Sequence, residues 1–253
     1  MKMKKTDLKG KSKHFSFVFL STYLSEPQSP EHDQEDDVSS DECEDDEEEG
    51  EDESEEKSRK VSAAAMVVHA GSFHEKPECQ GLAHFCEHMI FMGSKKYPDE
   101  NELDSFLSRN SGSTNAFTEL EYTNYHFDVA PDKFRDGLDI WAQFFIDPLM
   151  KEDSVEREVT AVHSEFEMAK TDDYCRKFQI IQEAVMKKGH PQSGFFWGNR
   201  KSLWEDPKTI SKSAYDMLHD WYPRNYSSNL MKLVIQSRST KKYNLMFSLT
   251  FLC

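Results

Sequence analysis

The stretch VSAAAMVVHAGSFHEKPECQGLAHFCEHMI, residues 61–90, joins a strand pattern to a helix pattern and decides the fold. Residues 61–70 are mostly small and apolar, which is typical of a buried strand, and we expect this strand to end at Gly71. Residues 80–92 then predict a helix. The folded part of the chain therefore begins near Val61 with a strand that leads into a helix.

Further strands and a series of helices follow this first unit. Residues 113–118 look extended, and residues 122–129 alternate apolar and polar side chains, which predicts a half-buried strand. A last strand is predicted over 230–236. Helices are predicted over 99–109, 131–147, 153–170, 172–187 and 211–221, with a loop over 189–208. This order predicts an α+β fold, a two-layer module with a mostly antiparallel sheet and helices packed on one face.

Apolar side chains at helical spacing predict which helix faces are buried. The helix over 153–170 is expected to turn its valines inward, and the helix over 172–187 is expected to bury a stripe of its own. The predicted apolar stripes are Phe134, Leu138, Trp141 and Phe145 in the first long helix, Val155, Val159, Val162, Phe166 and Ala169 in the second, and Tyr174, Phe178, Ile181 and Val185 in the third.

Four segments are predicted along the chain. Residues 1–24 form an N-terminal segment whose apolar part, 15–24, is expected to be a strand, because Ser and Thr interrupt it too often for a signal peptide. Residues 25–60 form an acidic insert that we expect to be disordered. Residues 61–236 form the folded domain. Residues 237–253 form a divergent tail that does not resemble the natural end of a domain.

The charge of the chain is concentrated in the insert. The chain has 47 acidic and 31 basic residues, and 18 of the acids lie in residues 31–56, which contain no Lys or Arg. The insert is either a solvated linker or a handle for basic partners. The net charge of −16 argues against binding to nucleic acid.

The sequence contains no run of 18 apolar residues, so it predicts no helix that spans a membrane. Five scattered Cys favour a cytoplasmic location, with a cell-surface or extracellular pool as the alternative.

The motif HFCEH is the strongest chemical signal. On a helix, His84 and His88 lie one turn apart on the same face, so that their imidazoles can bind one Zn²⁺. Glu87 lies on a neighbouring stripe, from which its carboxylate can accept a proton. This order of residues is the inverted zincin motif. The spacing also occurs by chance, so the motif needs a third ligand.

The helix over 153–170 offers that ligand. Glu158 and Glu165 are seven residues apart, close to two turns, so they point along one edge beside the valine stripe. A carboxylate at the border of the core needs a partner. From spacing alone, a solvated edge with Arg157 nearby remains an equal alternative.

Five longer segments extend the pattern beyond the motif: GLAHFCEHMIFMGSKKYPDENELDSFL (81–107), GSTNAFTELEYTNYHFDV (112–129), EREVTAVHSEFEMA (156–169), FFWGN (195–199) and NYSSNLM (225–231). Together they resemble the insulinase (pitrilysin) family of zinc peptidases, in uninterrupted order from about residue 61 to 236. An acidic block just before the first zinc-bearing module looks like one branch of that family, whereas HFCEH and NAFT look more like another.

The resemblance implies a role for each matching residue. His84, His88 and Glu165 match the ligands of a single Zn²⁺, Glu87 matches the general base, and Glu158 matches the Glu that supports the site. An edge strand that pairs with the substrate backbone is matched by Asn115, Ala116, Phe117 and Thr118. The implied activity is a zinc metalloendopeptidase that acts on basic peptides at dibasic sites. The implied fold is a two-layer α+β module.

The sequence departs from the family in three ways. His163 stands where relatives usually have Asp, and it lies about 200° round the helix from Glu165, so we do not expect it to be a ligand. Cys86 lies inside the motif, where we expect a small buried hydrophobe. Family members are much longer, with a second half that encloses the substrate. We therefore expect weak activity from this chain alone and exposure of the stripe at Trp141 and Phe145.

The missing half leaves a rival function open. The chain is either a peptidase or a non-catalytic fragment that captures basic partners through its acidic arm. Its expected partners are basic peptides and either a full-length relative or the missing C-terminal half.

Overall fold

The structure is a computed structural model, which describes residues 5–6, 12–13, 16–20 and 61–237. Its centre is a five-stranded sheet in the order β3-β7-β4-β6-β5. Strand β3 pairs with β7 in parallel, and the other three pairings are antiparallel. A separate pair, β1 and β2, lies near the N-terminus. The sheet strands are β3 Ser16–Leu20, β4 Ser62–Val68, β5 Ser113–Thr118, β6 Thr123–Val129 and β7 Met231–Gln236, and the pair is Lys5–Thr6 with Ser12–Lys13.

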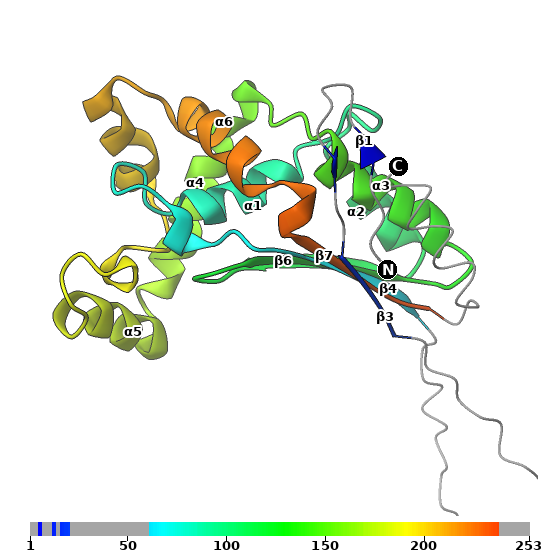
Figure 1. Cartoon of the computed structure of the whole chain (residues 1–253), viewed down its shortest axis with the longest axis horizontal. Helices are drawn as coiled ribbons and strands as arrows, with labels where there is room; N and C mark the ends of the chain where they lie inside the picture. Colours follow the sequence, from blue (N-terminus) through cyan, green and yellow to red (C-terminus); the bar gives the residue numbers. More distant parts are fainter. Residues whose placement is uncertain (1–4, 7–11, 14–15, 21–60, 238–253) are drawn as a thin grey trace, which may run out of the picture.

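Helices gather on one side of this sheet, and α5 stands apart at one end of the molecule (Figure 1). The predicted α+β module with a mostly antiparallel sheet is therefore confirmed. The α-helices are α1 Leu82–Ile90, α2 Glu102–Arg109, α3 Phe134–Ile146, α4 Val155–Ala169, α5 Asp173–Ala184 and α6 Ala214–Asn225. Short 3-10 turns are η1 Ser72–His74, η2 Glu152–Ser154, η3 Pro191–Ser193, η5 Asp206–Ile210 and η6 Ser228–Leu230, and η4 Lys201–Glu205 is a π-helical turn.

The core lies between the sheet and the helices. Every second residue of β4 and β6 is buried, and the alternation of β6 is the one expected from its sequence. The ring of Trp141 on α3 packs against the ring of Phe127 on β6, with 5.2 Å between the ring centroids. Trp141 is fully buried and Phe145 is 8% exposed, so the stripe predicted from helical spacing is confirmed as buried, and the exposure expected from the shorter length of this chain is wrong. The helix layer of this chain covers these two rings itself.

The predicted burial of the 172–187 helix is also wrong in part. Tyr174 is 75% exposed and Val185 is 70% exposed, while Phe178 and Ile181 are half-buried. The apolar stripe of α5 is real, but α5 stands apart from the sheet against which such a stripe would pack. Residues 189–208 are likewise not all loop, because η3, η4 and part of η5 form there.

The N-terminal and C-terminal predictions are only partly within the described residues. The expected strand over 15–24 is present as β3, Ser16–Leu20. The acidic insert over 25–60 and residues 238–253 of the tail lie outside the described residues. Within the described part, we find no helix with the length and apolarity needed to cross a bilayer.

Candidate metal centre

Helix α1 carries the HFCEH motif, and its first turn is held at three points. The carboxylate of Glu75 accepts the backbone N–H groups of Gly81 and Ala83, each at 2.7 Å, which satisfies two donors that a helix start leaves open. Gly81 has φ +86°, and a Cβ there would lie 2.1 Å from the Cα of Gly198. Only glycine fits this position, and it lets the start of α1 pack directly against the backbone of the loop that carries Trp197.

Three predicted ligand residues meet between α1 and α4. One ligand atom from each of His84, His88 and Glu165 lies within 4.8 Å of the other two. The Nε2 atom of His84 is 3.0 Å from one carboxylate oxygen of Glu165, and the Nε2 atom of His88 is 3.5 Å from the other oxygen. Two imidazoles and one carboxylate are the donor set of a catalytic zinc site.

Partners at the other ring nitrogens orient both imidazoles. The Nδ1 atom of His84 is 2.7 Å from the backbone carbonyl of Trp197, and the Nδ1 atom of His88 is 3.3 Å from the carboxylate of Glu158. Each partner accepts the Nδ1 proton, so the Nε2 atoms of both rings face Glu165. Trp197 is a site residue that our sequence reasoning missed, although its segment, FFWGN, had carried part of the family resemblance.

Glu158 resolves the alternatives left by its spacing. The residue is 8% exposed, and its carboxylate lies 3.3 Å from the Nδ1 atom of His88 and 3.0 Å from the Nε atom of Arg157. Arg157 is therefore a bonded partner at this edge of the core. Glu158 thus bonds the Nδ1 atom of His88 and is not among the three clustered ligand residues.

The charges at the centre shift the pKa values of its members. Burial alone would lower the pKa of His88, but hydrogen bonds to Glu158 and Glu165 outweigh it and raise that pKa to about 9. Hydrogen bonds from His84 and His88 hold the pKa of Glu165 well below its ordinary value. The cluster therefore favours a carboxylate in Glu165.

Glu87 lies beside this cluster and is largely buried. It is 9% exposed, and burial raises its pKa, opposed by a hydrogen bond from Thr118. The hydroxyl of Thr118 donates to the Oε2 atom of Glu87 at 2.5 Å. Thr118 was expected to contact substrate, which stays a prediction, whereas the structure shows its hydroxyl bonded to one oxygen of Glu87.

The other predicted substrate residues lie on β5 at the end of the described sheet. One edge of β5 pairs with β6, and among the described strands none pairs with its other edge. Thr114, Ala116 and Thr118 are half-buried, whereas Asn115 and Phe117 are exposed. The strand therefore offers an edge along which a peptide backbone could pair.

The two remaining sequence departures have clear positions. The Nδ1 atom of His163 is buried without a hydrogen-bond partner in the described part of the chain, and its ring lies 6.5 Å from that of Phe166. It is not among the three clustered ligand residues. Cys86 is fully buried in the core, and burial raises the pKa of its thiol.

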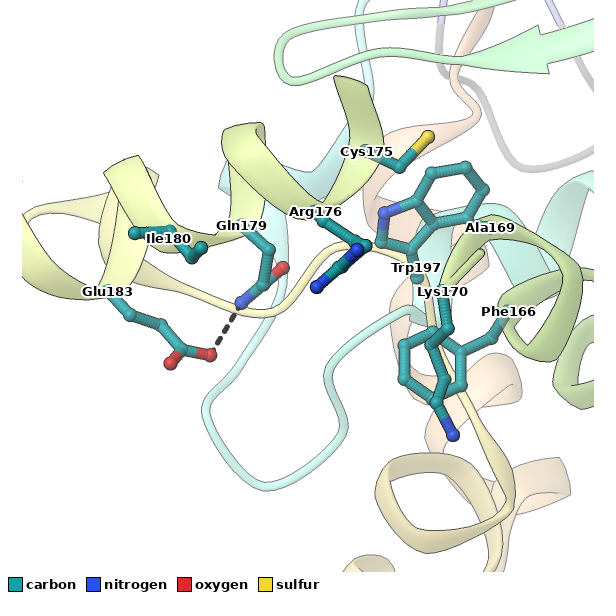
Figure 2. Close-up of a pocket in the computed structure, with 9 residues that line it drawn as sticks. All are labelled: Phe166, Ala169, Lys170, Cys175, Arg176, Gln179, Ile180, Glu183 and Trp197. Carbon is teal, nitrogen blue, oxygen red and sulfur yellow. Dashed lines mark hydrogen bonds between the residues drawn. The ribbon is translucent and has the colours of Figure 1, made fainter. Parts of the chain in front are cut away.

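Two cavities lie near the centre, each of about 330 Å³. One is mostly apolar and lies between the end of α4 and α5. Figure 2 shows the indole of Trp197 beside Cys175 and Arg176 of α5, with Phe166 of α4 and Lys170, the residue after α4, on the opposite side. The other cavity lies between α2, β5 and the metal cluster, and Glu87, His88 and Glu165 all line it.

Comparisons with known proteins agree with this geometry. Residues 53–194 match the family model described as Insulinase (Peptidase family M16). The chain is 47% identical to human nardilysin over 181 residues, which is 72% of this chain and 16% of that protein. It is 49% identical to an Arabidopsis thaliana nardilysin-like protein over 176 residues, 70% of this chain and 17% of the relative. It is 44% identical to human insulin-degrading enzyme over 179 residues, 71% of this chain and 18% of the relative.

A solved structure is also similar to this chain in fold and sequence. The crystal structure of pitrilysin superimposes with a TM-score of 0.71 at 35% identity, over 76% of this chain and 20% of that chain. This chain thus spans about a fifth or less of the length of these relatives. Both branches suggested by the sequence, nardilysin and insulin-degrading enzyme, are among the matches. The family match covers more than half of the chain, so this chain belongs to the insulinase family, peptidase family M16.

Proposed function

We propose that this chain is a zinc-dependent endopeptidase module that hydrolyses peptides, with a preference for basic sequences and dibasic sites. The observation that carries the proposal is the cluster of His84, His88 and Glu165, whose ligand atoms lie within 4.8 Å of one another beside Glu87. Both imidazoles turn Nε2 toward Glu165, and their Nδ1 atoms are bonded elsewhere. This donor set suits one Zn²⁺ and leaves a position for substrate.

The bound ion would supply Lewis acidity toward water and toward the scissile carbonyl. The protein supplies the proton transfer and the positioning. The hydroxyl of Thr118 already donates to the Oε2 atom of Glu87, and we assign to its Oε1 atom the acceptance of the proton of the attacking water. Glu87 then passes that proton to the nitrogen of the leaving amine. The edge of β5 would hold the peptide backbone alongside.

The proposal is tested on the 253-residue chain itself. We expect about one zinc per chain after dialysis and slow cleavage of a dibasic peptide that exceeds a Glu87→Gln control. Turnover is expected to be low. The chain spans about a sixth of the length of its curated relatives, so it offers fewer residues that can hold the substrate in position. Well-oriented reactants gain effective molarities of about 10⁵–10⁸ M, so lost positioning costs much of the rate.

The outcomes of that test separate the two candidate functions. Absence of zinc would contradict the metal centre. Zinc without any cleavage would favour the rival function, a fragment that captures basic partners or associates with a longer relative. Turnover at a rate ordinary for a peptidase would contradict the expectation that the missing length matters. We also propose a cytoplasmic location, on the ground that Cys79, Cys86 and Cys175 are free thiols.

The acidic insert gives a separate prediction. Deleting residues 31–56 should leave zinc content and thermal unfolding unchanged, because a self-repelling segment adds nothing to a core. The deletion should weaken binding of a cationic peptide at low salt, and the difference should shrink as salt rises, since screening acts within about 8 Å at physiological ionic strength. A chain of the same length with 31–56 replaced by Gly and Ser is the control. Loss of cooperative unfolding in both variants would contradict a disordered insert.

A further inference from the structure

The cavity beside the metal cluster has an unusual charge pattern. Its apolar floor comes from α2, α3 and the two residues that follow α1, and the strand β5 also lines it. Two carboxylates that are not part of the metal cluster, Glu100 and Asp104, also line the cavity. The apolar floor residues are Phe91, Met92, Leu103 and Phe144.

Of these two carboxylates, Glu100 is already neutralised. Its Oε2 atom lies 2.6 Å from the guanidinium of Arg157, and its Oε1 atom lies 3.7 Å from the ammonium of Lys151. The hydroxyl of Ser154 also donates to its Oε1 atom, at 3.2 Å. Glu100 therefore has little remaining capacity to attract a ligand cation.

The other carboxylates of the cavity are also engaged, except for Asp104. Glu87 accepts from Thr118, while Glu158 and Glu165 contact the two imidazoles. Asp104 lies exposed in the first turn of α2 and has neither an ion pair nor a hydrogen bond to any residue within the described ranges. It is thus the carboxylate of this cavity that remains available to a ligand.

Strand β5 determines what can reach Asp104. Successive side chains of a paired peptide strand point to opposite faces, and one set would point the same way as Thr114 and Ala116, which line the cavity. Thr118 bonds Glu87, so Ala116 and Thr114 lie two and four residues away along the strand. At about 3.4 Å per residue, the cavity lies within roughly two to four residues of the reacting bond.

We propose that Asp104 is a specificity-determining residue that binds a cationic side chain, Lys or Arg, of the peptide substrate. The proposal rests on the proposed peptidase function and assigns its preference for basic peptides to one carboxylate. The apolar floor suits the methylene stem of such a side chain, and its charged end would pair with the carboxylate of Asp104 in the same cavity. A neutral polar side chain of the same length fills the space but gains no charge pairing.

The test uses the zinc-loaded 253-residue chain carrying Glu87→Gln, so that peptides bind without being cut. Labelled octapeptides carry one Arg, or one neutral citrulline of the same shape, in turn at each of the four residues on either side of one bond. Fluorescence anisotropy measures their affinities. At one position the Arg peptide should bind about three- to fivefold more tightly than its citrulline partner, the size expected of a partly exposed ion pair.

Substitutions at Asp104 should change this ratio alone. Asp104→Asn should bring it to about one with little change for the citrulline peptide, and Asp104→Arg should invert it. Glu102→Gln removes one charge from the same helix, outside the cavity lining, and should leave the ratio unchanged. A ratio that survives Asp104→Asn overturns the assignment, as does an equal loss for both peptides.

The peptidase proposal has its own readouts in this experiment. Zinc content and cleavage of the citrulline peptide by the chain with Glu87 intact do not depend on Asp104. If that peptide is cut and Arg gives no advantage, only the assignment of Asp104 fails. If neither peptide binds to the zinc-loaded chain, both proposals fail.

Discussion

Replacing Glu165 by alanine is expected to lower the zinc affinity of this chain by more than about 100-fold. Changes to residues that only support a ligand typically cost 10- to 100-fold in metal affinity, and removal of a direct ligand should cost more. The carboxylate of Glu165 faces the Nε2 atoms of both His84 and His88. Without it, two imidazoles remain, which is one ligand short of a catalytic zinc site. The measurement is a competition titration with a chromophoric chelator.

Two residues of the same helix provide graded controls. Glu158→Gln keeps the shape of the side chain that orients His88 but removes its charge, so we expect a loss of about 10- to 100-fold. His163→Ala should leave zinc affinity nearly unchanged, because His163 is two residues from Glu165 and not part of the cluster. Thermal unfolding of each variant without zinc separates lost ligands from lost folding. A larger loss in His163→Ala than in Glu165→Ala would mean that the wrong side of α4 has been chosen.

The sequence could predict this centre because its main residues lie on regular helices. The spacing of His84 and His88 requires only that α1 be helical, and the seven-residue spacing of Glu158 and Glu165 requires only that α4 be helical. The alternation of β6 likewise determined which of its faces is buried. In each case a local period of the chain placed residues on one face or edge, whereas the roles expected of Glu165 and Glu158 came from the family resemblance and not from their spacing.

Features that depend on tertiary contacts could not be predicted in this way. The acceptor for His84 is a backbone carbonyl at Trp197, 113 residues away, and every residue has such a carbonyl. The bond from Thr118 to Glu87 likewise depends on how β5 packs against α1. For α5 the pattern predicted an amphipathic helix correctly, but not that Tyr174 and Val185 would be left exposed. A helical stripe says which face is apolar and not what covers it.

The second large effect is expected from Glu87→Gln, which should reduce peptide cleavage by about 10²- to 10⁴-fold, the usual contribution of a general base. Zinc affinity should change little, because Glu87 is not one of the three ligand residues. The amide oxygen of glutamine can still accept the Thr118 hydroxyl, so the side chain should keep its position. What the variant loses is a carboxylate oxygen able to take a proton.

This prediction needs a sensitive readout, because the parent chain is expected to be slow. Long incubation with a dibasic peptide, followed by mass spectrometry of the products, measures cleavage without a label. Glu102→Gln is the matched control, since it makes the same chemical change on α2 outside the metal centre. If Glu87→Gln binds zinc normally and cleaves at the parent rate, Glu87 is not the base, and residual activity must come from another group or a contaminant. If it loses zinc as well, Glu87 acts on the metal centre and not on the proton, so the division of roles between Glu87 and Glu165 would be wrong.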